Sequence, residues 1–185
     1  MLEVRIHGRG GQGVQVACQI LAGALFRSGR HVQAFAAYGG ERRGAPVTAF
    51  VREDNRPIRL RCDIERPHHL LVFDPSILDD GRVVADVRPG GLVVVNSREG
   101  SRAVLPEGIR LVAVDAAAIA LRARLGTIVS TAMVGAFCGA AGLVSLEDLV
   151  AAVEEGSPAR ASDNVLACTV AYREAAGLEI AERLA

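Results

Sequence analysis

The sequence predicts an α/β protein with three layers, α/β/α, built on a mostly parallel, Rossmann-like sheet that carries an antiparallel hairpin. Three observations support this fold class. Apolar runs of strand length alternate with segments of helical periodicity. Two of those runs are entirely apolar, which is typical of parallel strands buried on both faces. A glycine-rich turn joins the first strand to the first helix. The 185 residues predict one domain spanning 1–185, which is long enough to enclose a proper core.

The expected strands occupy residues 2–6, 31–37, 47–52, 58–61, 70–73, 92–95 and 110–114. Residues 47–52 and 58–61 flank an Asp54-Asn55 turn, so they predict the hairpin. Its polar face would carry Arg52, Arg56, Arg59 and Arg61. Solvated charges on an edge strand are the commoner explanation of such arginines. Docking of another subunit is the alternative.

Helical segments follow the strands. In the first, Val14, Cys18 and Leu21 share one face, together with Ala17 and Leu25. Helix caps are expected at Asp74, before Pro75, and at Asp115 and Ser145. A final helix should follow residues 162–164.

Residues 126–146 carry no charge, and this stretch is long enough to span a bilayer. However, the stretch is rich in alanine and glycine and lacks a basic flank. We therefore predict a helix of about residues 128–141, buried between neighbours that Gly135 and Gly139 allow to approach closely.

The chain is organised around a glycine motif that follows the first strand. Gly8, Gly10 and Gly13 have the spacing G-x-G-x-x-G, and the intervening residues are Arg9, Gly11 and Gln12. Amides at the start of the next helix favour an anion. The second strand carries no acid to hold a ribose, so an NAD site is disfavoured. A tight turn whose glycines serve packing is the alternative.

A second loop, residues 38–46, carries Glu41, Arg42, Arg43 and Gly44 among three glycines. Adjacent guanidinium groups can bind phosphate or carboxylate with two parallel hydrogen bonds. From the charge run alone, a solvated loop whose arginines face water is the favoured explanation.

The composition excludes several classes of function. Net charge is zero, which argues against a dedicated nucleic-acid or membrane-surface protein. The four cysteines are too far apart for a C-x-x-C metal or iron–sulfur site, and His68 and His69 lack ligand partners at suitable spacing. No metal site or catalytic residue is therefore predicted in this chain. The sequence contains no lysine, and its start enters a strand directly without a signal peptide, so a cytoplasmic location is expected.

Taken together, several segments resemble the gamma subunit of 2-oxoacid:ferredoxin oxidoreductases. The resemblance rests on residues 6–13, 32–35 and 38–47, the last containing E-R-R-G-A-P. It continues through residues 57–59, 74–75, 94–97 and 164–167, so it covers nearly the whole chain.

The resemblance implies a subunit of an enzyme that oxidatively decarboxylates a 2-oxoacid to an acyl-CoA and reduces ferredoxin. Alpha, beta and delta subunits would be its partners, and would hold thiamine diphosphate, Mg²⁺ and [4Fe–4S] clusters. Coenzyme A would be a ligand shared with this chain. The E-R-R-G-A-P run resembles pyruvate-type members more than 2-oxoglutarate-type ones.

Residues 8–13 and 41–44 follow two strands that we expect to be adjacent and to end at the same edge of the sheet. We therefore predict that the two segments form one surface facing coenzyme A or a partner subunit. Two other classes of function stay open. One is a free-standing nucleotide- or anion-binding module, and the other is a regulatory or assembly subunit that touches no cofactor.

Overall fold

The computed structural model describes residues 1–38, 44–79, 81–100, 104–157 and 159–184. Within them, six strands form one sheet in the order β2-β3-β1-β4-β5-β6. The strands are β1 (Leu2–Arg9), β2 (His31–Tyr38), β3 (Pro46–Asp54), β4 (His69–Val72), β5 (Leu92–Asn96) and β6 (Arg110–Val114). The helices are α1 (Val14–Arg27), η1 (Pro75–Leu78), α2 (Arg82–Ala85), α3 (Ala116–Arg122), α4 (Ser130–Ala141), α5 (Leu146–Gly156) and α6 (Ala161–Leu184).

The sheet is mixed. Strands β1, β4, β5 and β6 run parallel to one another, whereas β3 is antiparallel to both of its neighbours, β1 and β2. The predicted α/β class and the mostly parallel sheet with antiparallel strands are confirmed. The predicted hairpin partner was wrong, because β3 pairs with β2 over the whole length of β2 and residues 58–61 form no strand.

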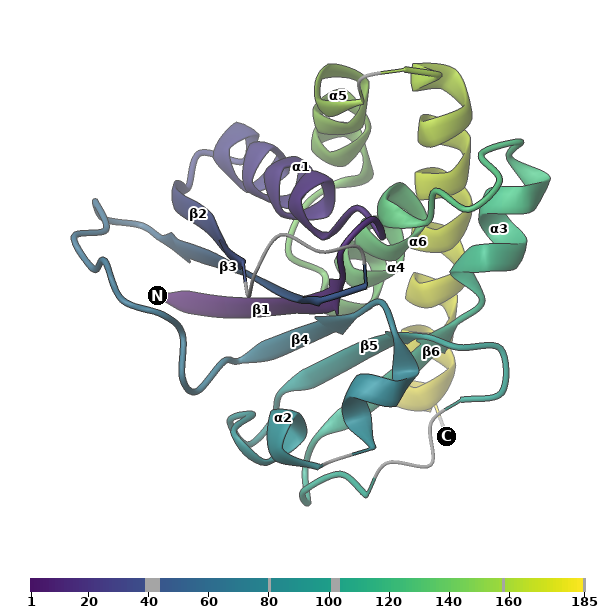
Figure 1. Cartoon of the computed structure of the whole chain (residues 1–185). Helices are drawn as coiled ribbons and strands as arrows, with labels where there is room; N and C mark the ends of the chain where they lie inside the picture. The colour runs from purple at the N-terminus through teal and green to yellow at the C-terminus, as the bar shows by residue number, and fades with distance from the viewer. Residues whose placement is uncertain (39–43, 80, 101–103, 158, 185) are drawn as a thin grey trace.

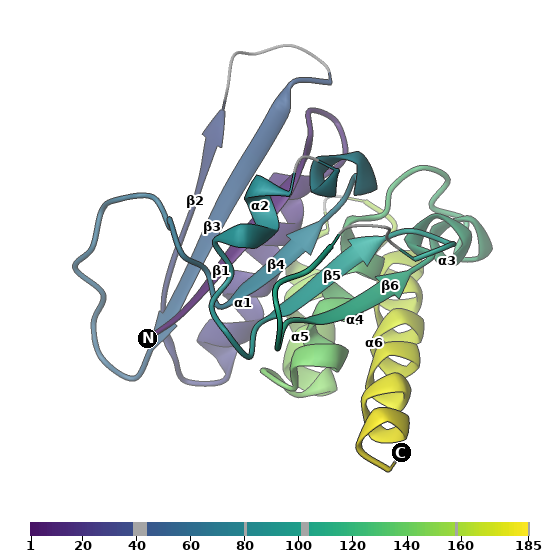
Figure 2. The ribbon, with the colours of Figure 1, turned by 90° about the horizontal axis from the view of Figure 1, so that it is seen from below.

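Helices cover the two faces of the sheet unequally. Among the described helices, α1 and α3 to α6 lie on one side of the sheet, and η1 and α2 lie on the other (Figures 1 and 2). The larger core fills the five-helix side, where Ile6, Leu71 and Val94 pack against α1 and α4. A smaller core on the other side joins Leu70 and Val93 to η1 and α2.

Helix α4 is buried at every residue from Ser130 to Ala140, which explains why its sequence carries no charge. A Cβ atom on Gly135 would lie 2.2 Å from the Cys168 carbonyl oxygen, and one on Gly139 would lie 2.2 Å from that of Tyr172. Only glycine therefore lets the α4 and α6 backbones touch, as predicted. Among the described helices, none is long and apolar enough to cross a membrane.

The predicted caps are confirmed at three helix starts. The side chains of Asp74, Asp115 and Ser145 accept hydrogen bonds from the backbone amides of Ser76, Ala118 and Asp148. The start predicted for the last helix was too late, because α6 already begins at Ala161.

Candidate functional site

Strand β1 separates two environments, because successive side chains point to opposite faces of a sheet. Val4 and Ile6 are fully buried beneath the helices. The alternate positions are Glu3, Arg5, His7 and Arg9, whose side chains point to the other face of the sheet. There they form hydrogen bonds with neighbouring strand residues and with the segments next to that face. The glycine loop, defined as residues 8–13, begins where this strand ends.

The glycines of this loop have different roles. A Cβ on Gly8 would lie 2.5 Å from Val14 Cγ2, and one on Gly13 would lie 3.0 Å from Ser130 Cβ at the start of α4. Close packing therefore requires both glycines, as the tight-turn alternative predicts. Gly11 is different, because its φ is +95° and a Cβ there would meet no atom within 4 Å. That position faces open space.

Two backbone hydrogen bonds join the glycine loop to the second loop that the sequence singled out. The Gly10 amide donates to the Ala45 carbonyl at 2.9 Å, and the Gly44 amide donates to the Gly10 carbonyl at 3.4 Å. Strands β1 and β2 are separated by β3, so the predicted adjacency of these two strands was wrong. The structure nevertheless brings Gly44 to the glycine loop. Glu41, Arg42 and Arg43 lie outside the described residues.

Arg9 joins three segments around this loop. Its Nε donates to Asp74 Oδ2 in an ion pair, and its terminal nitrogens donate to Ser76 Oγ at 3.0 Å and the Gly44 carbonyl at 3.5 Å. Burial raises the pKa of Asp74, but hydrogen bonds from Ser76 and Arg9 outweigh it and lower that pKa overall. The carboxylate is therefore charged at neutral pH and holds the guanidinium in place. The sequence marked Asp74 only as a helix cap.

The start of α1 offers donors beside these groups. No side chain caps this helix at Gly13, and its first turn contains no acid. The first amides of a helix have no partner within it and carry the positive end of the helix dipole. Gln12 folds back instead, and its Oε1 accepts from the Arg9 amide at 2.7 Å. The Gln12 side chain thus stabilises the loop by a hydrogen bond within it, and the Arg9 side chain ties the loop to neighbouring segments.

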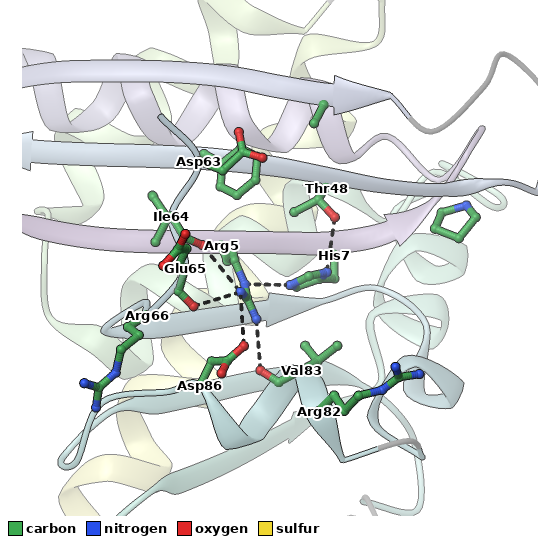
Figure 3. A pocket seen from close by; sticks show the side chains of 13 residues that line it. Arg5, His7, Thr48, Asp63, Ile64, Glu65, Arg66, Arg82, Val83 and Asp86 are labelled. Atoms are coloured by element: carbon green, nitrogen blue, oxygen red, sulfur yellow. Dashed lines mark hydrogen bonds and ion pairs between the residues drawn. The ribbon is translucent and has the colours of Figure 1, made fainter. Parts of the chain in front are cut away.

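A trough with a volume of about 910 Å³ lies next to the loop, on the side of the sheet that bears η1 and α2. Figure 3 shows Arg5 between its two walls. The Arg5 guanidinium donates to the Glu65 carbonyl at 3.1 Å on one wall and to the Val83 carbonyl at 3.1 Å on the other. It also pairs with Asp86 at 3.8 Å. Arg5 therefore fixes the width of the trough.

His7 forms part of the trough floor. Its Nε2 accepts from Arg5 Nε at 3.1 Å, which leaves the proton on Nδ1, 3.4 Å from Thr48 Oγ1. Burial, with a smaller contribution from the Arg5 charge, lowers the pKa of His7 to about 4. The ring is therefore neutral at physiological pH. The sequence did not identify His7 or Thr48 as neighbours, because they come from strands β1 and β3.

Three other polar residues at or next to strand ends have structural partners. Asn96 donates to the Phe73 carbonyl and accepts from the Ala116 amide. The imidazole Nδ1 atoms of His68 and His69 accept from the Glu3 and Leu92 amides. In the described part of the chain, no three histidine, cysteine or acidic side chains are grouped as metal ligands would be.

Known proteins are similar to this chain in sequence and fold. The family model described as pyruvate ferredoxin/flavodoxin oxidoreductase matches residues 3–174. The chain is 46% identical over 159 residues to the pyruvate/ketoisovalerate oxidoreductases common subunit gamma of Thermococcus kodakarensis, covering 84% of this chain and 86% of that one. It is 43% identical over 175 residues to the pyruvate synthase subunit PorC of Methanocaldococcus jannaschii, covering 94% and 97%.

A solved structure agrees with these sequence matches. The crystal structure of the pyruvate oxidoreductase subunit PORC from Thermotoga maritima superposes with a TM-score of 0.80 at 32% identity, covering 93% of this chain and 95% of that one. The chain therefore belongs to the pyruvate ferredoxin/flavodoxin oxidoreductase family. The resemblance to gamma subunits that the sequence indicated is confirmed.

Proposed function

We propose that this chain is the gamma subunit of a multi-subunit, cytoplasmic pyruvate:ferredoxin oxidoreductase. That enzyme converts pyruvate and coenzyme A to an acyl-CoA and carbon dioxide, and passes the electrons to ferredoxin. The observation that carries the proposal is the similarity to gamma and PorC subunits over 84% and 94% of the chain. Alpha, beta and delta subunits complete the enzyme, and the chain is inactive alone.

This chain supplies a binding surface rather than a reacting group. The surface consists of the glycine loop, with Gly8, Arg9, Gly10, Gly11, Gln12 and Gly13, and of the second loop, with Glu41, Arg42, Arg43 and Gly44. The start of α1, which has no side-chain cap and no acid in its first turn, and the open space at Gly11 fit a phosphate group of coenzyme A. Arg9, oriented by Asp74, contributes a fixed positive charge beside that group.

Thiamine diphosphate with Mg²⁺ and the [4Fe–4S] clusters belong to the partner subunits, where they supply decarboxylation and electron transfer. This chain then has two tasks, to hold coenzyme A or the partner at the glycine loop and to exclude water from that contact. The relative in Thermococcus kodakarensis is named as common to pyruvate and ketoisovalerate oxidoreductases. That name supports a division of labour in which other chains select the oxoacid.

The test replaces Arg42 and Arg43 with alanine in the assembled enzyme. The apparent KM for coenzyme A should rise about tenfold or more, because two charge-assisted contacts to phosphate are lost, while the KM for pyruvate stays unchanged. Arg98→Ala, at an exposed position, is the matched control. An unchanged KM for coenzyme A in an intact complex would refute this role for the two arginines.

A free-standing nucleotide- or anion-binding module is the second candidate, favoured by the trough that one chain forms beside its glycine loop. An anaerobic pull-down from the native host separates the two functions. Recovery of thiamine- and iron–sulfur-binding chains, with coenzyme A-dependent pyruvate oxidation, supports the subunit. Recovery of a lone chain that binds a nucleotide supports the module.

A further inference from the structure

The segment around residues 58–61, which was wrongly predicted to be a strand, is an irregular loop with defined contacts. We call residues 55–61 the arginine loop. It forms the first half of the connection between β3 and β4 and projects beyond the ends of the strands, next to the N-terminus (Figures 1 and 2). Arg56, Arg59 and Arg61 on this loop are all exposed. None of the three forms an ion pair with the described part of the chain.

The arginine loop is anchored although it is irregular. The buried Arg52 donates to the Cys62 carbonyl at 2.8 Å and to the Asp63 carbonyl at 3.2 Å, just after the loop. Gln33 of β2 donates to the Leu60 carbonyl, and the Arg56 amide donates to Asp54 Oδ1 at 3.1 Å. The backbone is therefore pre-organised, which reduces the entropy lost on binding.

The composition of the loop matches a protein interface. Leu60, which lies between Arg59 and Arg61 in the sequence, is 43% exposed, so the loop presents an apolar side chain as well as arginines. Arginine is enriched at binding hot spots, and complementary charge across an interface accelerates association. The nearby carboxylates of Asp54 and Glu53 are already paired, with the N-terminus and Arg30. Asp63 and Glu65 line the trough instead.

We propose that the arginine loop docks an acidic surface on another subunit of the same enzyme complex. Arg56, Arg59 and Arg61 pair with carboxylates of that subunit, and Leu60 fills an apolar contact between them. This inference rests on the proposed function, because it requires a complex. It assigns a docking role to a surface separate from the glycine loop.

The absence of lysine from the chain permits a direct test. In Arg59→Lys, the new amine keeps the charge and can be joined to a contacting carboxylate by a zero-length carbodiimide in the assembled complex. The expected product is a crosslink from residue 59 to an aspartate or glutamate of another subunit, located by mass spectrometry. Arg98→Lys is the matched control and should give no such product. An intact complex without a crosslink at residue 59 would overturn the proposal.

An affinity measurement provides the second test. The triple variant Arg56→Ala/Arg59→Ala/Arg61→Ala should bind the remaining subunits about tenfold more weakly at low salt, with a flatter salt dependence. Its unfolding curve should match the wild type, because all three side chains are exposed. Unchanged affinity would overturn the docking role and leave the proposed function intact. Failure of the wild-type chain to join any complex would instead refute the proposed function. Binding of an oligonucleotide through these arginines, without the crosslink, would overturn the protein partner.

Discussion

The two faces of the sheet bury different kinds of side chain. Beneath the five helices, aliphatic side chains such as Val4 and Ile6 are fully buried, and glycines let α4 and α6 touch. On the other face, β1 places Glu3 and Arg5, which are 7% and 8% exposed and held by hydrogen bonds. One face of strand β1 therefore belongs to an apolar core, and its other face belongs to a network of charged side chains. The helix-covered face stabilises the fold through close packing, and the other face does so by pairing each buried charge. Different kinds of substitution should therefore destabilise the two faces.

The largest effect is expected on the charged face. Arg52→Met removes the guanidinium that bonds Glu3 Oε1 at 2.9 Å and leaves that buried carboxylate with Arg88 alone. Unfolding in urea should show a loss of about 4 kcal/mol. Adding Glu3→Gln should recover part of it, since no buried charge then lacks its partner. If the double variant is no more stable than the single one, the pairing account of this face is wrong.

Shape should dominate on the helical face. Gly139→Ala puts a methyl group against the Tyr172 carbonyl of α6 and forces the two helices apart. We expect a loss of about 3 kcal/mol in the free energy of unfolding. No second-site charge change should rescue it. A loss below 1 kcal/mol would mean that α6 can shift without cost.

One histidine on each face allows a comparison by pH. Burial lowers the pKa of His7 on the charged face and of His69, whose ring packs against Phe137 of α4, to about 4 from the ordinary 6.5. Between these values the unfolded chain binds more protons than the folded one. Stability therefore rises with pH across this window and falls as pH drops from 6.5 to 4.

Each ring should contribute about 3 kcal/mol to that fall. His7→Gln and His69→Gln, measured by urea unfolding at pH 4.5 and pH 7, should each flatten the dependence. Equal slopes in a variant and the wild type would show that its histidine does not titrate in this window.

The smallest expected effect is a gain. Gly23 lies in α1, where an added Cβ would meet Ala152 Cβ at an ordinary 3.6 Å. Gly23→Ala should stabilise the protein by about 1 kcal/mol, because alanine loses less backbone freedom in a helix. Thermal unfolding of Gly23→Ala and Gly139→Ala, measured side by side, should show that a glycine-to-alanine substitution raises stability at residue 23 and lowers it at residue 139. Destabilisation by both would mean that the contact at residue 152 is tighter than its distance indicates.

The sequence predicted the elements better than their pairing. Apolar runs marked β4, β5 and β6 because a strand buried on both faces needs little polar surface. Arg59 and Arg61 alternate with apolar residues as in a strand, although residues 58–61 form no strand. Alternation indicates which side chains share a face, but not what covers that face. Arg52 was therefore expected on a polar surface, whereas it is 1% exposed.

The candidate site was predicted in part for a similar reason. The glycine loop is a local pattern, and the strand, turn and helix around it were visible in consecutive residues. The ion pair of Arg9 with Asp74 joins residues 65 positions apart, and no local pattern announces it. His7 and Thr48 meet only because β1 and β3 pair antiparallel, with residue 7 opposite residue 48. Long-range register was the missing information.

The contact between α4 and α6 also has a consequence for synthesis of the chain. A ribosome makes α4 before α6, and the face of α4 that packs against α6 has no cover until residues 161–184 have emerged. During that interval, the face of α4 around Gly135 and Gly139, which touches α6 in the finished fold, is available to a chaperone or to another nascent chain. Release of a complete C-terminal helix is therefore the event that closes the larger core.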